Sequence, residues 1–177
     1  MNVMDAIRNR RSVRAYDPRP IPAEVMQRMK DALRLAPSAC NYQPWTFVLA
    51  AEAELKADLG KAARGQMFVA DAPIIVIAVG YPDRAFKSMG GRGNSVDVDL
   101  AIAMDHLTLA AAADGLGTCW IGAFDESAVK RLIRAPEETK VVAMTPLGYP
   151  ARKDLIHPIA PGRRKAEADV FIEDRFA

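Results

Sequence analysis

Near its start the chain reads Arg8-Asn9-Arg10-Arg11-Ser12-Val13-Arg14, which places four arginines and one hydroxyl within seven residues. Guanidinium groups are planar and permanently charged, so they suit phosphate oxygens, and a hydroxyl with backbone amides can complete the contact. A second basic motif, Arg163-Arg164-Lys165, stands near the other end of the chain. Composition alone favours solvated surface charge for both motifs. Our hypothesis is that folding brings them together around one phosphate, and that the chain between them builds the pocket for the molecule that carries it.

The composition indicates one globular domain, residues 1–177, whose last part, from about 149 to 177, is an irregular tail containing several prolines. With 24 basic and 22 acidic residues the net charge is +2, so no overall basic field points to nucleic acid. No apolar signal segment follows Met1, and no apolar run approaches the roughly 18 residues of a membrane span. We therefore expect a cytoplasmic protein without a nucleic-acid or membrane partner.

The cysteines and histidines form no metal-binding or nucleophile motif. Cys40 and Cys119 lie far apart, which is more typical of separate thiols than of a disulfide or a metal site. His106 and His157 are too few for a zinc or iron centre, and the chain contains no G-x-S-x-G motif. We therefore expect neither a resident metal nor a covalent nucleophile.

Hydrophobic periodicity predicts alternating helices and strands. Helices are expected after the cap Asn2, between Pro22 and Pro37, around 55–63, over about 96–114 and after the cap Asp125. Strands are expected at Thr46–Leu49, Ile74–Val79, Thr118–Ile121 and Val141–Met144. Because Ile74–Val79 is apolar throughout, it should be buried on both faces. Alternation alone would favour a doubly wound parallel sheet.

Glycine-rich phosphate loops are not present in a recognisable form. Gly115-Leu116-Gly117-Thr118-Cys119-Trp120 has tryptophan where G-x-G-x-x-G needs its third glycine, and it follows a helix rather than a strand. The glycines between 90 and 93 lack the spacing of a P-loop. What remains is Ala36-Pro37-Ser38-Ala39-Cys40-Asn41-Tyr42-Gln43-Pro44-Trp45, a helix exit that displays a hydroxyl and two carboxamides. Carboxamides both donate and accept hydrogen bonds, so they can read a heterocyclic edge, although an ordinary capped loop has the same composition.

Taken in series, these motifs resemble the nitroreductase family of flavin enzymes. The resemblance runs through Ile7–Arg14, Pro20-Ile21-Pro22, Ala36–Phe47, Gly115–Phe124, Leu147–Pro150 and Arg164-Lys165. It implies an α+β fold with three layers, in which helices flank a mixed, mostly antiparallel sheet and FMN lies at the interface of a homodimer. The chain resembles the compact members of the family.

The resemblance also implies which residues contact FMN. The phosphate and ribityl chain would be held by Arg10, Arg11, Ser12 and Arg14, with Arg164 and Lys165 closing on the phosphate and Arg163 as a substitute. Pro37, Ser38, Ala39 and Asn41 would reach the flavin of the other subunit. Gln66 would read the pyrimidine edge, and the backbone amides of Gly122 and Ala123 would face flavin N5. Several relatives carry Glu-Gly at the last two positions, which puts their substrate-side contacts in doubt here.

The implied activity is the transfer of two electrons from NAD(P)H to nitroaromatics, quinones or flavins by a ping-pong mechanism, without a catalytic acid or base from the protein. A second interpretation keeps the flavin but changes the reaction to reductive dehalogenation or another specialised flavin oxidation, with the segment Arg84–Asn94 as the only candidate lid. A third is a non-enzymatic flavin-binding regulatory dimer, with the flavin covered by Tyr42, Trp120 or Phe124. The sequence leaves open the acceptor and the choice between NADH and NADPH.

Overall fold

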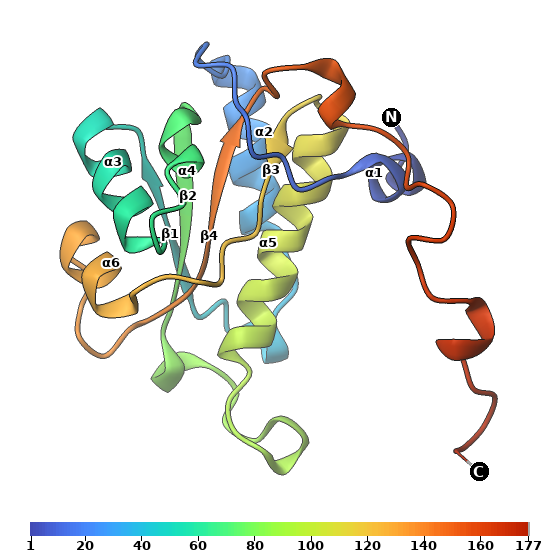
Figure 1. Ribbon diagram of the computed structural model, residues 1–177. Coiled ribbons are helices and arrows are strands. Elements are labelled where there is room, and N and C mark those ends of the chain that lie inside the picture. Colours follow the sequence, from blue (N-terminus) through green and yellow to red (C-terminus); the bar gives the residue numbers. More distant parts are fainter. Residues whose placement is uncertain (177) are drawn as a thin grey trace.

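The computed structural model describes residues 1–176 and contains one antiparallel sheet of four strands in the order β1-β2-β4-β3 (Figure 1). The strands are β1 (Trp45–Ala50), β2 (Ile74–Gly80), β3 (Gly117–Thr118) and β4 (Lys140–Gly148). Every pair of neighbouring strands is antiparallel, and a single-residue bridge between Ser12 and Thr118 adds a parallel pairing at the β3 edge. The doubly wound parallel sheet that alternation favours is therefore wrong, whereas the mostly antiparallel sheet implied by the resemblance is confirmed.

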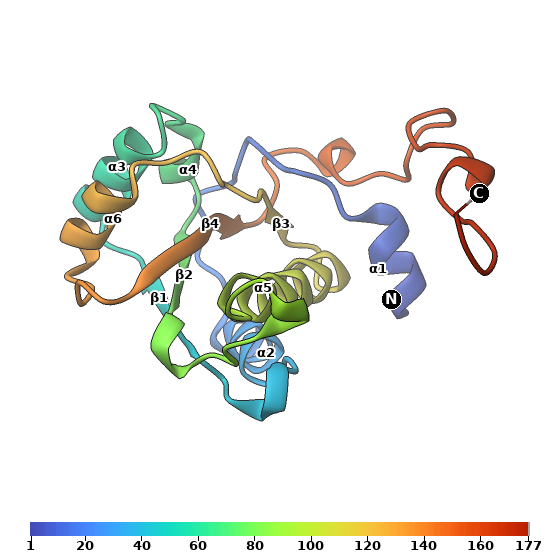
Figure 2. The same ribbon diagram turned by 90° about the horizontal axis from the view of Figure 1, so that it is seen from below.

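Helices cover both faces of this sheet (Figures 1 and 2). One layer contains α1 (Val3–Asn9), α2 (Ala23–Arg34) and α5 (Val96–Ala113), and the other contains α3 (Ala53–Ala62), α4 (Phe68–Asp71) and α6 (Glu126–Ile133). A separate hydrophobic cluster fills the space between the sheet and each helical layer. β2 contributes to both clusters, because successive side chains of a strand point to opposite faces. Its predicted burial on both faces is confirmed.

Most of the expected elements form, and the clearest difference is at β3. The strand is only two residues long, although the sequence predicts Thr118–Ile121. After Thr118 the backbone N–H of Cys119 donates to Oγ1 of Thr145 instead of to a strand carbonyl, at 3.0 Å. Pairing resumes only as an isolated bridge between Ile121 and Met144. A side-chain hydrogen bond thus interrupts the ladder and turns the chain away from the sheet.

The helix caps follow the sequence closely. Asn2 caps α1 through a capping box with Asp5, and the side chain of Asp125 accepts the Ala128 N–H at the start of α6. α2 ends at Arg34, earlier than the expected stop at Pro37. Within residues 1–176, no helix has the length and apolar character needed to cross a membrane.

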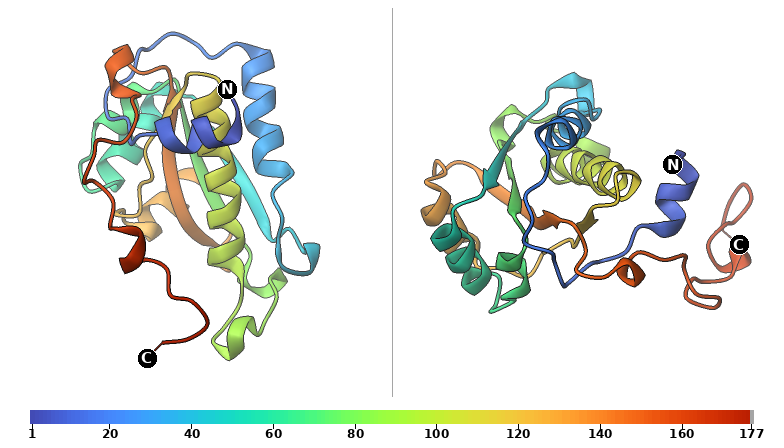
Figure 3. Two further views of the ribbon diagram at one scale, coloured as in Figure 1. Left: turned by 90° about the vertical axis from the view of Figure 1, so that its right-hand side faces the viewer. Right: turned by 90° about the horizontal axis from the view of Figure 1, so that it is seen from above.

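The C-terminal tail begins with contacts to the N-terminal segment and then leaves the body of the molecule (Figure 3). Tyr16 bridges to Pro150, and the N–H of Ala151 donates to the Ala15 carbonyl at 2.9 Å. Beyond Ile159 every described side chain is exposed, including Phe171 at 70% and Phe176 at 85%. In the described region the tail contains only short turns.

Candidate functional site

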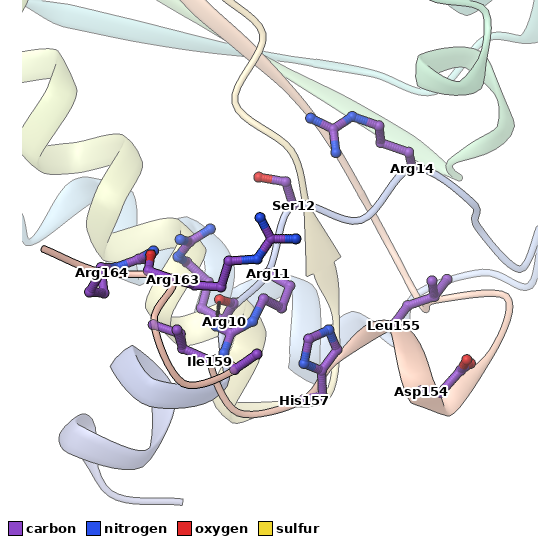
Figure 4. Close-up of a pocket in the computed structure, with 11 residues that line it drawn as sticks. Arg10, Arg11, Ser12, Arg14, Asp154, Leu155, His157, Ile159, Arg163 and Arg164 are labelled. Atoms are coloured by element: carbon purple, nitrogen blue, oxygen red, sulfur yellow. Dashed lines mark hydrogen bonds between the residues drawn. The ribbon is translucent and has the colours of Figure 1, made fainter.

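The two basic motifs meet in one cavity of about 550 Å³, here called the basic pocket (Figure 4). It is lined by Arg10, Arg11, Ser12, Arg14, Asp154, Leu155, His157, Ile159, Ala160, Arg163 and Arg164. In the view of Figure 4, four of the five arginines gather on one side of Ser12 and Arg14 lies on the other. Residues of both motifs therefore line one cavity, although Lys165 is not among them; that a phosphate binds between the motifs stays a prediction.

The N-terminal motif is fixed by Val13, which is 1% exposed. Its N–H donates to the Thr118 carbonyl at 2.9 Å, and the hydroxyl of Tyr16 donates to its carbonyl at 2.7 Å. The side chain of Val13 lies against Gly117, where an added Cβ would come within 2.7 Å of it. Because neighbouring side chains of an extended segment point to opposite sides, burying Val13 directs Ser12 and Arg14 toward the pocket.

The positive charge of the pocket is not balanced by carboxylates. Among residues 1–176, no salt bridge involves any of its five arginines. Asp154 also lines the pocket, but it pairs with Arg152, at 3.2 Å. Desolvation, and then the neighbouring charges of Arg10 and Arg164, lower the pKa of Arg11. Like charges held this close together favour binding of an anion.

Arg11 also stabilises the shape of the pocket. Its guanidinium donates to the Arg8 carbonyl at 2.8 Å and to the carbonyl of Arg10, so it binds the end of α1. On the opposite wall, Nη1 of Arg164 donates to the Arg163 carbonyl at 2.9 Å. Several donors of each guanidinium are left for a ligand, because a guanidinium carries five N–H groups.

The wall behind the pocket is buried and electrically neutral. Cys119 is 2% exposed, and burial raises the pKa of its thiol, while Arg14, Ser12 and Arg10 act in the opposite direction. Burial also raises the pKa of the Tyr16 hydroxyl. Both groups therefore stay protonated near neutral pH.

His157 is a pocket residue that sequence reasoning missed. Its Nδ1 lies 2.7 Å from the Pro158 carbonyl, so Nδ1 carries the proton in this contact. Nothing near His157 in the sequence marks it as part of a site, because the nearest basic motif begins only at Arg163. Its position follows from the turn Lys153–Leu155, which brings the tail back across the N-terminal motif.

The loop Ser38–Gln43 lies elsewhere, at the N-terminal end of α5 (Figure 1). Pro37, Ser38, Ala39 and Asn41 do not line the basic pocket. The pocket is at the other end of this helix, since α1 packs beside the C-terminal half of α5 and β3 follows it in the chain. The structure therefore separates the two halves of the site that the resemblance implies.

Gln66, Gly122 and Ala123 form a third group outside the pocket lining. Nε2 of Gln66 donates to the Ala63 carbonyl at 2.9 Å and to the Ala123 carbonyl at 3.3 Å. Gly122 is exposed beside Trp120, which is itself 44% exposed. Phe124 instead packs against the core between the sheet and α3. The structure thus joins Gln66 to the Gly122-Ala123 segment but does not bring it to the arginines.

Within the described residues, no group of three or more His, Cys, Asp or Glu side chains is arranged to hold a metal ion.

Comparison with known proteins gives matches over the whole chain. A family profile described as "Nitroreductase family" matches residues 7–82 and 66–149. A protein of Methanothermobacter thermautotrophicus named "Putative NADH dehydrogenase/NAD(P)H nitroreductase" is 31% identical over 99% of this chain and 85% of its own. A protein of Bacillus subtilis named "FMN reductase [NAD(P)H]" is 28% identical over 90% of this chain and 70% of its own.

A solved structure gives the same result for the fold. A nitroreductase family protein from Clostridium novyi NT superposes with a TM-score of 0.81 and 30% sequence identity, over 89% of each chain.

Proposed function

The chain belongs to the nitroreductase family, and from this we propose that it is an FMN-dependent oxidoreductase that takes electrons from NAD(P)H. The observation that carries the proposal is the basic pocket, where five arginines from the two ends of the chain converge without carboxylate partners in the described residues. FMN ends in a phosphate that carries two negative charges, which is the kind of group that such a cluster binds.

The residues of the pocket fit a phosphate better than a larger uncharged ligand. Ser12 offers a hydroxyl beside Arg10 and Arg14, and Arg163 and Arg164 approach from the tail. We propose that these five side chains, with Arg11 bracing the end of α1, hold the phosphate. Lys165 stays a prediction of the resemblance, since the cavity lining supports Arg163 in its place.

The proposal includes a homodimer, because the two halves of the site lie at opposite ends of α5. This helix has 18 residues, which corresponds to about 27 Å. A second copy would allow the Ser38–Gln43 loop of one chain to approach the pocket of the other. Apolar side chains left exposed on α1 and on the tail support such an interface: Val3, Met4, Ile7, Phe171 and Phe176.

Bound FMN would supply reversible two-electron chemistry, while the protein binds and orients the reactants. We propose that the open side of the site admits NAD(P)H and then an electron-poor acceptor, such as a nitroaromatic or a quinone. An open stacking surface selects weakly among flat molecules, so several acceptors should be reduced.

The visible absorbance spectrum of the pure protein tests this function. It is recorded without oxygen after addition of FMN, again after NADPH or NADH, and again after a quinone. We expect a flavin band that bleaches rapidly with one of the nicotinamides and returns with the quinone. A flavin band that neither nicotinamide bleaches would favour a specialised flavin reaction or a regulatory dimer, and a protein that binds no FMN would contradict the proposed cofactor.

A further inference from the structure

We infer that Asp99 is a positioning residue, whose buried carboxylate holds the Ser38–Gln43 loop in the conformation that serves the flavin site. This inference rests on the proposed function and adds a residue that the sequence motifs do not single out. Asp99 belongs to the first turn of α5, while the loop follows α2, so the contact joins segments that are 60 residues apart.

The carboxylate of Asp99 is almost fully buried, at 1% exposure. Its Oδ1 accepts the Ala39 N–H at 2.9 Å, and its Oδ2 accepts the Ser95 hydroxyl at 2.6 Å. Among the described residues it has no lysine or arginine partner. A buried carboxylate is costly unless it is hydrogen-bonded. These two bonds and the positive end of the α5 dipole provide that stabilisation.

The loop that Asp99 holds is conformationally strained. Cys40, Asn41 and Gln43 have φ values of 52°, 55° and 49°, in the left-handed region that favours glycine and that asparagine also tolerates. Cys40 and Gln43 each cost about 1–2 kcal/mol there, so the loop persists only where its surroundings fix it. Left-handed residues at functional sites often serve to aim backbone groups.

The loop's other described hydrogen bonds are local. Oγ of Ser38 accepts the Gln43 N–H at 2.9 Å, and Nε2 of Gln43 donates to Oδ1 of Asn41 at 3.1 Å. Both contacts would move with the loop if it shifted as a unit. The bond from Ala39 to Asp99 differs because it ties the loop to a long, well-packed helix. Asp99 therefore holds the middle of the loop against α5, while the two ends of the loop are held by the chain that continues from them.

The experiment compares Asp99→Ala with Asp97→Ala in the full chain loaded with FMN. Asp97 is the matched control, since it lies in the same turn of α5 but is exposed and pairs with Lys140 at 2.7 Å. We expect Asp99→Ala to bind FMN through its intact basic pocket, with a shifted flavin absorbance band and a kcat lowered on the order of 10- to 100-fold, because small misplacements have effects of this size. Asp97→Ala should match the unmodified protein in both properties.

The conservative variant Asp99→Asn separates positioning from simple destabilisation. Asparagine retains an oxygen that accepts the Ala39 N–H, so it should restore most of kcat and the flavin spectrum even if its melting temperature stays low. If Asp99→Ala does not fold, Asp99→Ser replaces it in the comparison, because its short side chain does not reach Ala39. Equal kcat and equal flavin spectra for Asp99→Ala, or its replacement Asp99→Ser, and Asp97→Ala would overturn the inference.

The two proposals fail in different ways. If the unmodified protein binds no FMN, the proposed function fails and the inference fails with it. If the unmodified protein turns over and Asp99→Ala turns over equally well, only the role of Asp99 is wrong.

Discussion

The basic pocket and the Ser38–Gln43 loop differ in what stabilises them. The pocket gathers five arginines that have no carboxylate partner in the described residues, and its tail wall is exposed. The loop carries no charged side chain, yet its strained backbone is fixed by hydrogen bonds to Ser38 and Asp99. The arginines of the pocket therefore lack a negatively charged partner, which an anionic ligand can supply. The loop is already held in place by other residues of its own chain.

This difference predicts how each region responds to the cofactor. Repulsion among the arginines decreases when an anion binds, so the pocket and tail should become more ordered on binding. The loop should change little, because its conformation is set before the ligand arrives. Substitutions in the pocket should accordingly act on affinity, and substitutions that move the loop should act on turnover.

The largest effect is expected for the double substitution Arg10→Ala/Arg164→Ala, which removes one arginine from each wall of the pocket. A hydrogen bond to a charged group contributes about 1.5–3 kcal/mol, so losing two should weaken FMN binding at least about 100-fold. Quenching of flavin fluorescence measures the affinity. The weakening should shrink in high salt, since salt screens the exposed charges that remain.

The double substitution Arg34→Ala/Arg131→Ala is the matched control for that result. It removes the same charge from exposed positions on α2 and α6, and neither residue lines the pocket. Lys165→Ala tests separately the prediction that Lys165 closes on the phosphate, because Lys165 stands next to the pocket arginines without lining the cavity. Comparable losses of affinity in the two double variants would mean that overall charge, rather than the pocket, attracts FMN.

The sequence predicts the pocket better than the loop, for physical reasons. Charge is visible in a sequence, so Arg8–Arg14 and Arg163–Lys165 stand out as basic motifs, and their convergence can be stated as a hypothesis. The left-handed φ angles of Cys40 and Gln43 give no such signal, because neither residue type favours this conformation. The burial of Asp99 cannot be predicted from the sequence either, because an aspartate in an apolar helix is expected to lie at the surface.

The same contrast holds for the secondary structure. The run Ile74–Val79 predicts a fully buried strand, because burial on both faces selects apolar side chains throughout. The end of β3 depends instead on the distant hydroxyl of Thr145, which a local pattern cannot reveal. Alternating helices and strands also misjudge the sheet, since they do not specify whether neighbouring strands run parallel or antiparallel.

The second prediction concerns the contact between Gly117 and Val13, which orients Ser12 and Arg14 toward the pocket. Gly117→Ala places a methyl group 2.7 Å from Val13, so Val13 must shift and take Ser12 and Arg14 with it. Overpacking of this kind costs about 1–3 kcal/mol of stability, and FMN affinity should fall with it. Chemical denaturation measures the first effect and a flavin titration measures the second.

The double substitution Gly117→Ala/Val13→Ala tests the cause. Shortening Val13 removes its two γ-methyl groups, which lie 2.7 and 3.0 Å from the added Cβ, and leaves only the contact with the Val13 Cβ at 2.8 Å. The clash is therefore smaller, and the double variant should be more stable than the sum of the two single losses predicts. Additive losses would show that the two side chains act independently and that Gly117 does not control the position of the N-terminal motif.

The smallest effect is expected at alkaline pH, where the buried wall of the pocket can be compared with the exposed thiol of the loop. Burial raises the pKa of Cys119 above its ordinary value of 9.0, so above about this pH the unfolded chain loses a proton that the folded chain keeps. The folded state then binds more protons, and the free energy of unfolding must fall as pH rises, by at most about 1.4 kcal/mol per pH unit for one group. Tyr16 adds to this fall in the free energy of unfolding at pH values above its ordinary pKa of 10.0.

Denaturation curves under reducing conditions should therefore show a shallower decline of the unfolding free energy with pH for Cys119→Ala than for the unmodified protein. Cys40→Ala, which removes the exposed thiol, shows what the loss of a thiol does by itself. Equal declines in all three proteins would mean that the wall behind the arginines admits enough water for Cys119 to ionise in the folded state, and the neutral wall assigned to the pocket would then be wrong.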